Sequence, residues 1–282
     1  MTKSLIRLTR YAQFAANIFK SFIREPGESL RILRALPLMV SGSLRARGWA
    51  GSFSERSANS CYPHELPENG LNPLKLYFES HKKGRGIVKW IHYFDIYQKH
   101  FEKFVGKEVN VVEIGVFSGG SLEMWKRYFG SKCRVYGIDI RKECKLYEDE
   151  ETKIFIGDQA DRRFWKQFRK QVSCVDIVID DGSHVPEQQI VTLEEMLPHI
   201  RSGGVYICED IHLHHNAFAA YIYGLSNRLN AMACDPGQLT PVYASGFQRS
   251  IHAIHLYPFV TVIEKTDIPA EHFTLIRQGT DW

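Results

Sequence analysis

Residues 109–121 read VNVVEIGVFSGGS, an apolar strand pattern that ends in a glycine-rich turn and leads into a helix pattern. Strand and helix patterns then alternate along the chain, which is typical of a parallel sheet with crossover helices. We predict strands at residues 109–114, 134–138, 153–156, 175–179 and 205–208, the last one opened by Gly203 and Gly204, helices at 121–128, 162–170 and 187–199, and an antiparallel hairpin within 250–264. The sequence therefore predicts an α/β fold with a Rossmann-like sheet and a C-terminal antiparallel hairpin.

The composition of the chain limits its class. Its 282 residues are 44% hydrophobic and 24% charged, which is typical of a globular protein and excludes a disordered, fibrous or disulfide-stapled one. No apolar run approaches the roughly 20 residues that a membrane-spanning helix needs. The six cysteines form no CxxC pattern, so we expect a reducing, cytoplasmic compartment and no structural zinc.

Charge is distributed unevenly along the chain. The first 50 residues hold nine Lys and Arg against two Glu, whereas the remainder holds 27 basic and 30 acidic residues. A nearly balanced main body argues against nucleic acid as an obligatory partner, because duplex binding requires a dense basic surface.

Residues 1–45 predict a basic amphipathic helix. Its apolar residues recur at helical spacing, namely Leu5, Leu8, Ala12, Ala15, Ile18 and Phe22. Three interpretations stay open: packing on the main domain or on another copy of the chain in a homo-oligomer, peripheral contact with a membrane surface, and a transit segment. Residues 48–72 read as a linker, so we predict a helical extension with its linker at 1–72 and one main domain at 73–282.

Residues 73–105 are aromatic and basic, with Lys89, Trp90 and Tyr97 among them. We expect this segment to form a helix that caps the domain, with Ile91, Phe94 and Phe101 among its buried residues.

The glycine turn favours a cationic ligand over a dinucleotide. Its spacing is G-x-x-x-G-G instead of G-x-G-x-x-G, and Glu113 stands directly before it. A carboxylate there would repel a pyrophosphate but suit S-adenosylmethionine, which carries a sulfonium and an ammonium group. Glu113, Gly115, Gly119 and Ser121 are the candidate cofactor-binding residues of this turn.

Acidic and amide side chains also end the next two strands. Asp139 follows the second strand, where a carboxylate can accept hydrogen bonds from both ribose hydroxyls. Asp158 and Gln159 follow the third strand, where a polar side chain can meet the adenine amino group. The alternative for each is a helix cap or a turn former.

The fourth and fifth strands end in an acidic cluster. The fourth leads into Asp180-Asp181-Gly-Ser-His184 and the fifth into Glu209-Asp210. Carboxylates this close raise one another's pKa unless a cation lies among them, and oxygen ligands suit Mg2+. The alternative is that these carboxylates only cap the helices that follow.

Four segments together resemble a known family: residues 112–125, 136–140, 179–184 and 204–210. They are similar to the metal-dependent class I methyltransferases of macrolide-sugar biosynthesis and to the related cephalosporin hydroxylase and rhamnosyl O-methyltransferase group. The resemblance covers roughly residues 85–265 and leaves residues 1–70 without a counterpart.

This resemblance implies a class I methyltransferase fold and an enzyme that transfers a methyl group from S-adenosylmethionine to a hydroxyl of a sugar or glycosylated natural product. It also implies that Asp181, Glu209 and Asp210 hold Mg2+ and that His184 is the base. We place Asp180 with the cofactor-binding residues.

The chemistry agrees with this role. A sugar hydroxyl is a poor nucleophile at neutral pH, and a histidine can accept its proton there. We therefore expect a small-molecule glycoside or polyol as the acceptor. Three alternatives stay open: a catechol-type methyltransferase, a nicotinamide-dependent oxidoreductase, which the glycine spacing disfavours, and a non-catalytic binding protein. His212, His214 and His215 either line the site or lie in an exposed loop.

Overall fold

The computed structural model describes residues 16, 19–20, 22–24, 26–51, 72–212, 216–231, 242–276 and 278–279. The chain divides into two compact units, Met1–Pro67 and Glu68–Trp282. In the first unit, helix α2 (Pro26–Gly51) begins with a proline, which is well suited to the first turn of a helix. Within the predicted helix at 1–45, residues 1–15, 17, 18, 21 and 25 lie outside the described residues, as do residues 52–71 of the linker. Helix α2 covers residues 26–45 of the predicted helix and continues through the first residues assigned to the linker.

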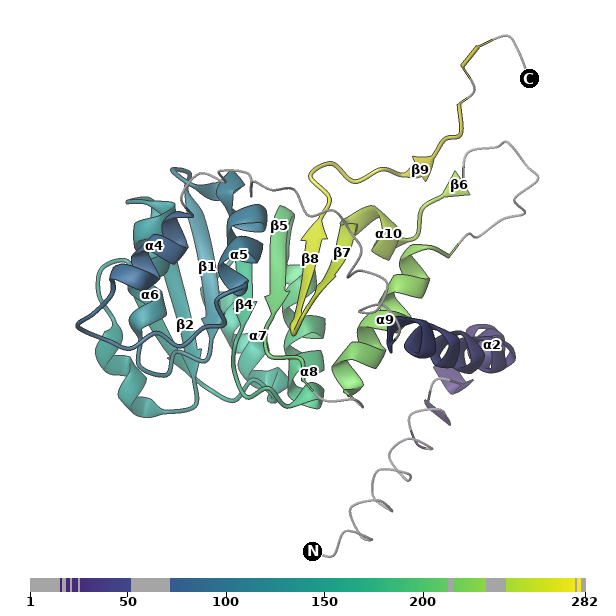
Figure 1. The fold of residues 1–282 in the computed structure, drawn as a ribbon, viewed down its shortest axis with the longest axis horizontal. Coiled ribbons are helices and arrows are strands. Elements are labelled where there is room, and N and C mark those ends of the chain that lie inside the picture. Colours follow the sequence, from purple (N-terminus) through teal and green to yellow (C-terminus); the bar gives the residue numbers. More distant parts are fainter. Residues whose placement is uncertain are drawn as a thin grey trace, which may run out of the picture. The chain divides into compact units, whose positions relative to one another are not determined.

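The second unit is built on a seven-stranded sheet with the order β3-β2-β1-β4-β5-β8-β7 (Figure 1). Its strands are β1 (Val109–Ile114), β2 (Cys133–Asp139), β3 (Thr152–Ile156), β4 (Val175–Asp180), β5 (Ile200–Cys208), β7 (Ile251–Tyr257) and β8 (Val260–Lys265). Strands β1 to β5 pair in parallel, and β8 pairs antiparallel with β5 and with β7. A separate pair joins β6 (Val242–Tyr243) and β9 (His272–Phe273).

Helices cover both faces of this sheet. One face packs against α4 (Pro73–Ser80), α5 (Tyr93–Phe101) and α6 (Gly120–Phe129), and the other against α7 (Arg162–Gln171), α8 (Pro186–Met196) and α9 (Ala217–Leu229). A short helix, α10 (Gly246–Ser250), precedes β7. The predicted α/β sheet with crossover helices and a C-terminal hairpin is therefore present.

Alternation along the strands divides the core between the two faces. In β1, Val109 and Val111 pack with the α4–α6 layer, whereas Val112 and Ile114 pack with the α7–α9 layer. Successive side chains of a strand point to opposite faces. The same rule decides where the polar residues at the strand ends point.

The structure corrects three local expectations. Residues 73–105 form two helices, α4 and α5, joined by the non-helical residues 81–92; Phe94 and Phe101 are buried, but Ile91 is 52% exposed. Strand β5 begins at Ile200, so the Gly-Gly pair lies inside it. Helix α8 ends at Met196 and continues as a 3-10 turn, Leu197–His199, which contains a proline.

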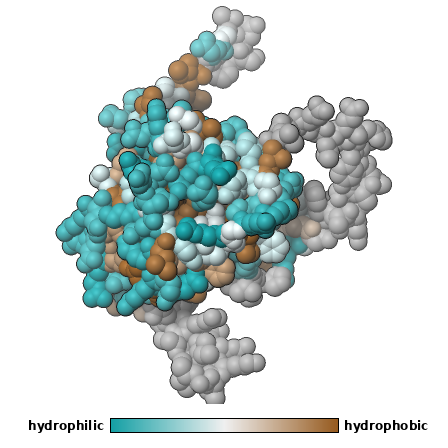
Figure 2. Space-filling model, turned by 90° about the vertical axis from the view of Figure 1, so that its left-hand side faces the viewer, coloured by the Kyte–Doolittle hydropathy of each residue, from teal (hydrophilic) through white to brown (hydrophobic). Residues whose placement is uncertain are grey.

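Among the described residues, no helix is both long and apolar enough to cross a membrane. The face shown in Figure 2 is mostly hydrophilic, and hydrophobic residues are scattered over it. Scattered apolar residues are normal on a protein surface and indicate no particular partner.

Candidate active site

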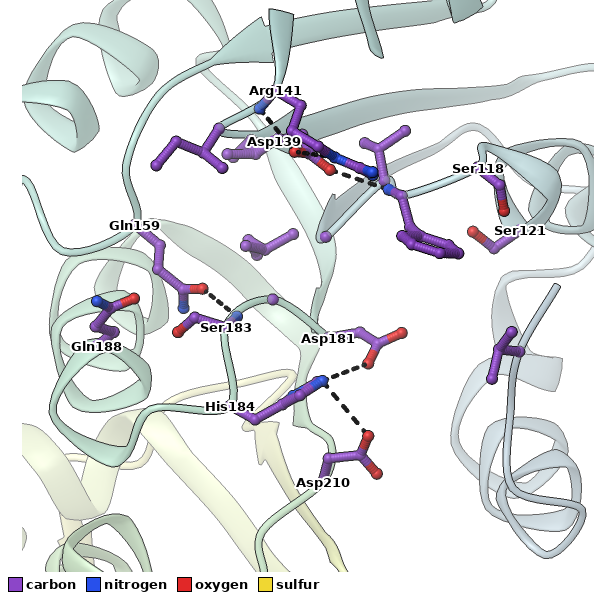
Figure 3. Close-up of a pocket in the computed structure, with 18 of the residues that line it drawn as sticks. Ser118, Ser121, Asp139, Arg141, Gln159, Asp181, Ser183, His184, Gln188 and Asp210 are labelled. Carbon is purple, nitrogen blue, oxygen red and sulfur yellow. Dashed lines mark hydrogen bonds and ion pairs between the residues drawn. The ribbon is translucent and has the colours of Figure 1, made fainter. Parts of the chain in front are cut away.

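A cavity of about 470 Å³ opens at the carboxyl ends of the parallel strands. Its walls come from the segments that follow β1 to β5 and from residues 86–89 (Figure 3). The strand order reverses between β1 and β4, and ligands of open α/β sheets bind at such a reversal. The volume suits a small-molecule ligand.

Strand register explains why residues far apart in sequence meet at this edge. Ile114 pairs with Ile138 of β2 on one side and with Asp180 of β4 on the other, and Asp180 pairs with Cys208 of β5. The residues that come next, Gly115, Asp139, Asp181 and Glu209, therefore lie in one row across the sheet.

At Gly115 the backbone of the glycine turn comes close to the segment that follows β4. The φ of Gly115 is +91°, and a Cβ there would collide with the carbonyl of Asp181. Gly119 also has a positive φ, +77°, but a Cβ there would meet the Tyr147 ring at 2.7 Å instead. Gly115 and Ser121 line the cavity, whereas Gly119 does not. Gly119 is thus needed for packing beside the turn.

Asp139 lines the cavity and also holds the turns around it. Its carboxylate accepts hydrogen bonds from the backbone N–H of Phe117 at 3.0 Å and of Arg141 at 2.8 Å. Burial alone would raise the pKa of Asp139, but these donors, with the Arg141 guanidinium, lower it below its ordinary value. A carboxylate has further lone pairs for a ligand.

Asp158 and Gln159 reach the cavity from the end of β3. Asp158 is exposed and caps the turn by accepting from the Ala160 N–H at 2.8 Å. The Gln159 amide is engaged within the protein: its Nε2 donates to Asp180 and its Oε1 accepts from the Ser183 N–H at 2.8 Å (Figure 3). Gln159 therefore fixes the turn after β4.

Two carboxylates expected at the cofactor point into the core. Glu113 is fully buried, and its carboxylate accepts from Ser121 Oγ at 2.8 Å and Trp125 Nε1 at 3.1 Å. Asp180 is also fully buried, accepts from Tyr206, and has a pKa raised to about 7 by burial. Neither lines the cavity. Strand alternation sends each side chain into a helix layer, so neither points into the cavity where we expected it to bind the cofactor.

Asp181, His184 and Asp210 converge at the cavity (Figure 3). His184 Nε2 lies 3.9 Å from Asp181 Oδ1 and 3.5 Å from Asp210 Oδ2. One ligand atom from each residue lies within 4.8 Å of the others. Both His184 and Asp210 have a φ of +55°, an uncommon conformation for residues other than glycine. Such strain is concentrated at functional sites.

Lys89 supplies a buried cation that the sequence did not place here. Its Nζ donates to Asp181 Oδ2 at 2.6 Å and to Glu209 Oε2 at 2.9 Å. Tyr97 donates to the other oxygen of Glu209 at 2.6 Å. Burial alone would lower the pKa of Lys89, but the two carboxylates raise it. Burial raises the pKa of Glu209, although Lys89 opposes that effect.

Glu209 therefore does not line the cavity with Asp181 and Asp210. It is 1% exposed and lies behind them, on the α5 side of the sheet. The predicted acidic cluster is present at one edge, but its three carboxylates are not equivalent. Two face the cavity and one is neutralised within the protein.

Aromatic residues before and within α5 hold Asp210. Its Oδ1 accepts from Trp90 Nε1 at 2.9 Å and from the Tyr93 hydroxyl at 2.7 Å. His212 lies 3.5 Å from the same oxygen, while His214 and His215 lie outside the described residues. The only sequence signal for this contribution was the aromatic and basic composition of residues 73–105.

The charges of the cluster suit a divalent cation. Among the described residues, Lys89 is the only Lys or Arg in an ion pair with Asp181, Glu209 or Asp210. One ammonium against three carboxylates leaves an excess of negative charge beside an open cavity. Oxygen ligands in such an excess are typical of a Mg2+ site.

Comparison with known proteins gives relatives of one kind. No family model matches the chain. Demethylmacrocin O-methyltransferase of Streptomyces fradiae is 37% identical over 133 residues, which are 44% of this chain and 33% of the relative. A rhamnosyl tetracenomycin-C 2'-O-methyltransferase of Streptomyces olivaceus is 37% identical over 135 residues, 45% of this chain and 35% of the relative.

A solved methyltransferase structure is also similar to this chain. MycE, a methyltransferase of the mycinamycin biosynthetic pathway solved with Mg and SAH, superposes with a TM-score of 0.57 and 26% identity over 69% of this chain and 54% of MycE. The chain is a homologue of sugar O-methyltransferases. Its sheet has the class I methyltransferase fold, as the motifs suggested. The chain spans about a third of the length of the two curated relatives.

Proposed function

We propose that this sugar O-methyltransferase homologue transfers a methyl group from S-adenosylmethionine to a hydroxyl of a glycosylated small molecule, with Mg2+ as cofactor. The observation that carries this proposal is the junction of two features in one cavity. A glycine turn with an acidic strand end, Gly115 and Asp139, adjoins a cluster of carboxylates and an imidazole, Asp181, Asp210 and His184.

The first feature fits the cofactor. Gly115 has no Cβ, which in any other residue would collide with the backbone of Asp181, so the turn can lie close to the cavity. Asp139 presents a carboxylate at the end of β2 that can accept hydrogen bonds from ribose hydroxyls. Asp158 extends from the end of β3 toward the same cavity. When bound, S-adenosylmethionine would supply an electrophilic methyl group. Its positive charge suits a cavity bordered by Asp139, Asp158 and Asp181.

The second feature fits Mg2+. Asp181 and Asp210 would hold the ion, because both carboxylates reach the cavity and are about one-fifth exposed. When bound, Mg2+ would make a coordinated hydroxyl more acidic. Glu209 lies behind these two carboxylates and would not contact the ion. It shares the Lys89 ammonium with Asp181, so that Asp181 would keep part of its negative charge for Mg2+.

His184 would serve as the base. Its ring is 37% exposed, and its Nε2 faces both carboxylates without a strong hydrogen bond to either. It can thus accept the proton of an acceptor hydroxyl at Nε2. The aromatic residues Trp90 and Tyr93 position Asp210 for this contact. Catalysis would depend largely on positioning.

Methyl transfer to a panel of rhamnosides and macrolide glycosides tests the proposal. We expect turnover with Mg2+ and none after chelation by EDTA. His184→Gln should fold and bind S-adenosylhomocysteine, yet lose roughly 10²–10⁴ in rate, the usual contribution of a positioned proton acceptor. The control is His252→Gln, a change at an exposed histidine of β7 outside the cavity. A folded His184→Gln protein with near-normal rate would remove His184 from the mechanism.

A further inference from the structure

A second cluster of metal-ligand side chains lies away from the cavity. His100 of α5, His255 of β7 and Glu264 of β8 each offer one ligand atom within 4.8 Å of the others. His100 Nδ1 lies 2.9 Å from Glu264 Oε1, and His255 Nε2 lies 3.1 Å from Glu264 Oε2. None of these residues lines the cavity described above. The proposed methyl transfer does not use them.

The fold brings these side chains together by register and alternation. Glu264 pairs with Ala253, and His255 pairs with Val262, so His255 and Glu264 are diagonal neighbours on one face of the hairpin. That face packs against α5, from which His100 reaches the hairpin. His252 lies at the β-bulge between Ile251 and Ala253, where the register of the hairpin shifts; it is exposed and does not belong to this cluster.

We propose that His100, His255 and Glu264 bind one Zn2+ ion, which fastens α5 to the β7–β8 hairpin. Two imidazoles and a carboxylate are a ligand set that zinc accepts, whereas Mg2+ prefers oxygen. Ligand atoms around a tetrahedral zinc are roughly 3.3 Å apart. The distances of 2.9 and 3.1 Å end on different oxygens of Glu264, and one ligand atom from each of the three residues lies within 4.8 Å of the others. The side chains therefore need only local adjustment to surround one ion.

The surroundings of the cluster support an ion. His100 is 2% exposed, and its second ring nitrogen, Nε2, lies 2.9 Å from the Tyr257 hydroxyl. A partner on the outer nitrogen is typical of zinc-binding histidines, since it fixes the tautomer and the ring orientation. The His255 side chain is 30% exposed, so an ion can enter and keep a water molecule as its fourth ligand. The cysteine pattern predicted no structural zinc, and this site contains no cysteine.

A bound ion would stabilise the frame of the proposed active site. Helix α5 carries Tyr93 and Tyr97, which hold Asp210 and Glu209. The hairpin turn accepts a hydrogen bond from Ile211 through the Phe259 carbonyl at 2.9 Å. Zinc at the cluster would thus join two elements that both reach the site.

Thermal unfolding and Co2+ spectroscopy on the full chain test this site. The protein is stripped with a chelator, dialysed, and titrated with Zn2+ or Co2+ in excess Mg2+. We expect one equivalent of Zn2+ to raise Tm by about 5–10 °C near saturation, and Co2+ to give the intense visible bands of a four-coordinate site. His255→Ala and the more conservative Glu264→Gln should abolish both signals.

Two matched variants separate this site from the others. His252→Ala and His184→Ala should retain both signals, because His252 is an exposed residue at the β-bulge outside the cluster and His184 belongs to the cavity cluster. S-adenosylhomocysteine binding by each variant verifies that it is folded, and if His255→Ala does not fold, Glu264→Gln decides. The proposal is overturned if the wild type shows neither signal, or if His184→Ala loses them while Glu264→Gln keeps them.

Discussion

Lys89 sets the charge balance at the centre of the site. It is buried between Asp181 and Glu209. In the folded protein, the ion pairs among these three groups replace their contacts with water. Removing one member of a buried ion pair leaves an uncompensated charge, which destabilises a protein far more than the loss of a surface pair. The ammonium is therefore a structural requirement of the acidic cluster.

Lys89→Met should lower the free energy of unfolding at neutral pH by about 3–5 kcal/mol. The double variant Lys89→Met/Glu209→Gln should recover part of that loss, since it removes one of the two stranded charges. Arg127→Met is the control, because Arg127 is 69% exposed and its ion pair with Glu123 lies at the surface. Urea denaturation without Mg2+ measures all three. A loss no larger than that of Arg127→Met would refute the buried pair.

Asp139 makes stability depend on pH in a defined direction. Its donors lower its pKa in the folded protein below the ordinary 3.8. A lowered carboxyl pKa contributes stability that is fully present above the unfolded-state pKa and is lost as the pH falls through the folded-state value.

Asp139→Asn should therefore reduce the free energy of unfolding by about 1.5–3 kcal/mol at pH near 7, the range for hydrogen bonds to a charged group. The difference between wild type and variant should shrink at pH below about 4. Denaturant unfolding at several pH values measures this difference directly. A gap that stays constant down to the lowest pH at which both proteins fold would contradict the lowered pKa.

At the scale of elements, the turn after β1 depends on glycine for two separate reasons. Gly115 combines a φ of +91° with backbone contact to Asp181, and Gly119 combines a positive φ with contact to a tyrosine ring. By contrast, Gly224 lies inside α9 with open space where its Cβ would be. The chain thus offers glycines whose replacement should act in opposite directions.

Gly115→Ala should lower the free energy of unfolding by about 1–3 kcal/mol through backbone strain. It should also weaken S-adenosylhomocysteine binding tenfold or more. Gly224→Ala should raise the free energy of unfolding by about 0.5–1 kcal/mol, since alanine favours a helix interior, and should leave binding unchanged. Urea denaturation and calorimetry measure both effects. Equal binding by the two variants would show that the turn does not contact the ligand.

The elements were predictable where a local pattern determines them. Apolar runs such as 175–179 became strands within a residue of the expected ends, and the glycine turn followed the first strand. The direction of the acidic side chains was harder to predict. Strand alternation places Glu209 in the α4–α6 layer and Asp180 in the other, whereas we expected the ends of the fourth and fifth strands to bring both into one cluster.

The contribution of residues 81–92 was not predictable. This segment has no helical or strand periodicity, and Lys89 and Trp90 reach the acidic residues only through tertiary packing. Their partners are 92 to 120 residues away in sequence. An aromatic and basic composition indicated burial of aromatic rings but carried no information on which lysine would enter the site.

At the scale of the whole main domain, the site is formed by the sheet and by residues 86–89, which precede the first strand. Five strand ends supply the floor of the cavity, and residues 86–89 close one side. The cofactor and metal contacts that we propose come from different strands: β1 to β3 for the cofactor and β4 and β5 for Mg2+. The two ligands should therefore bind with little dependence on each other.

Titration calorimetry with S-adenosylhomocysteine and with NAD, each in Mg2+ and in EDTA, tests the central claim most directly. We predict one site for S-adenosylhomocysteine with micromolar or tighter affinity, nearly the same in EDTA, and no heat with NAD. Asp139→Ala should weaken this binding by roughly tenfold or more, which corresponds to loss of a charge-assisted hydrogen bond. Binding of NAD without binding of S-adenosylhomocysteine would contradict the assignment of the cavity to a methyl donor.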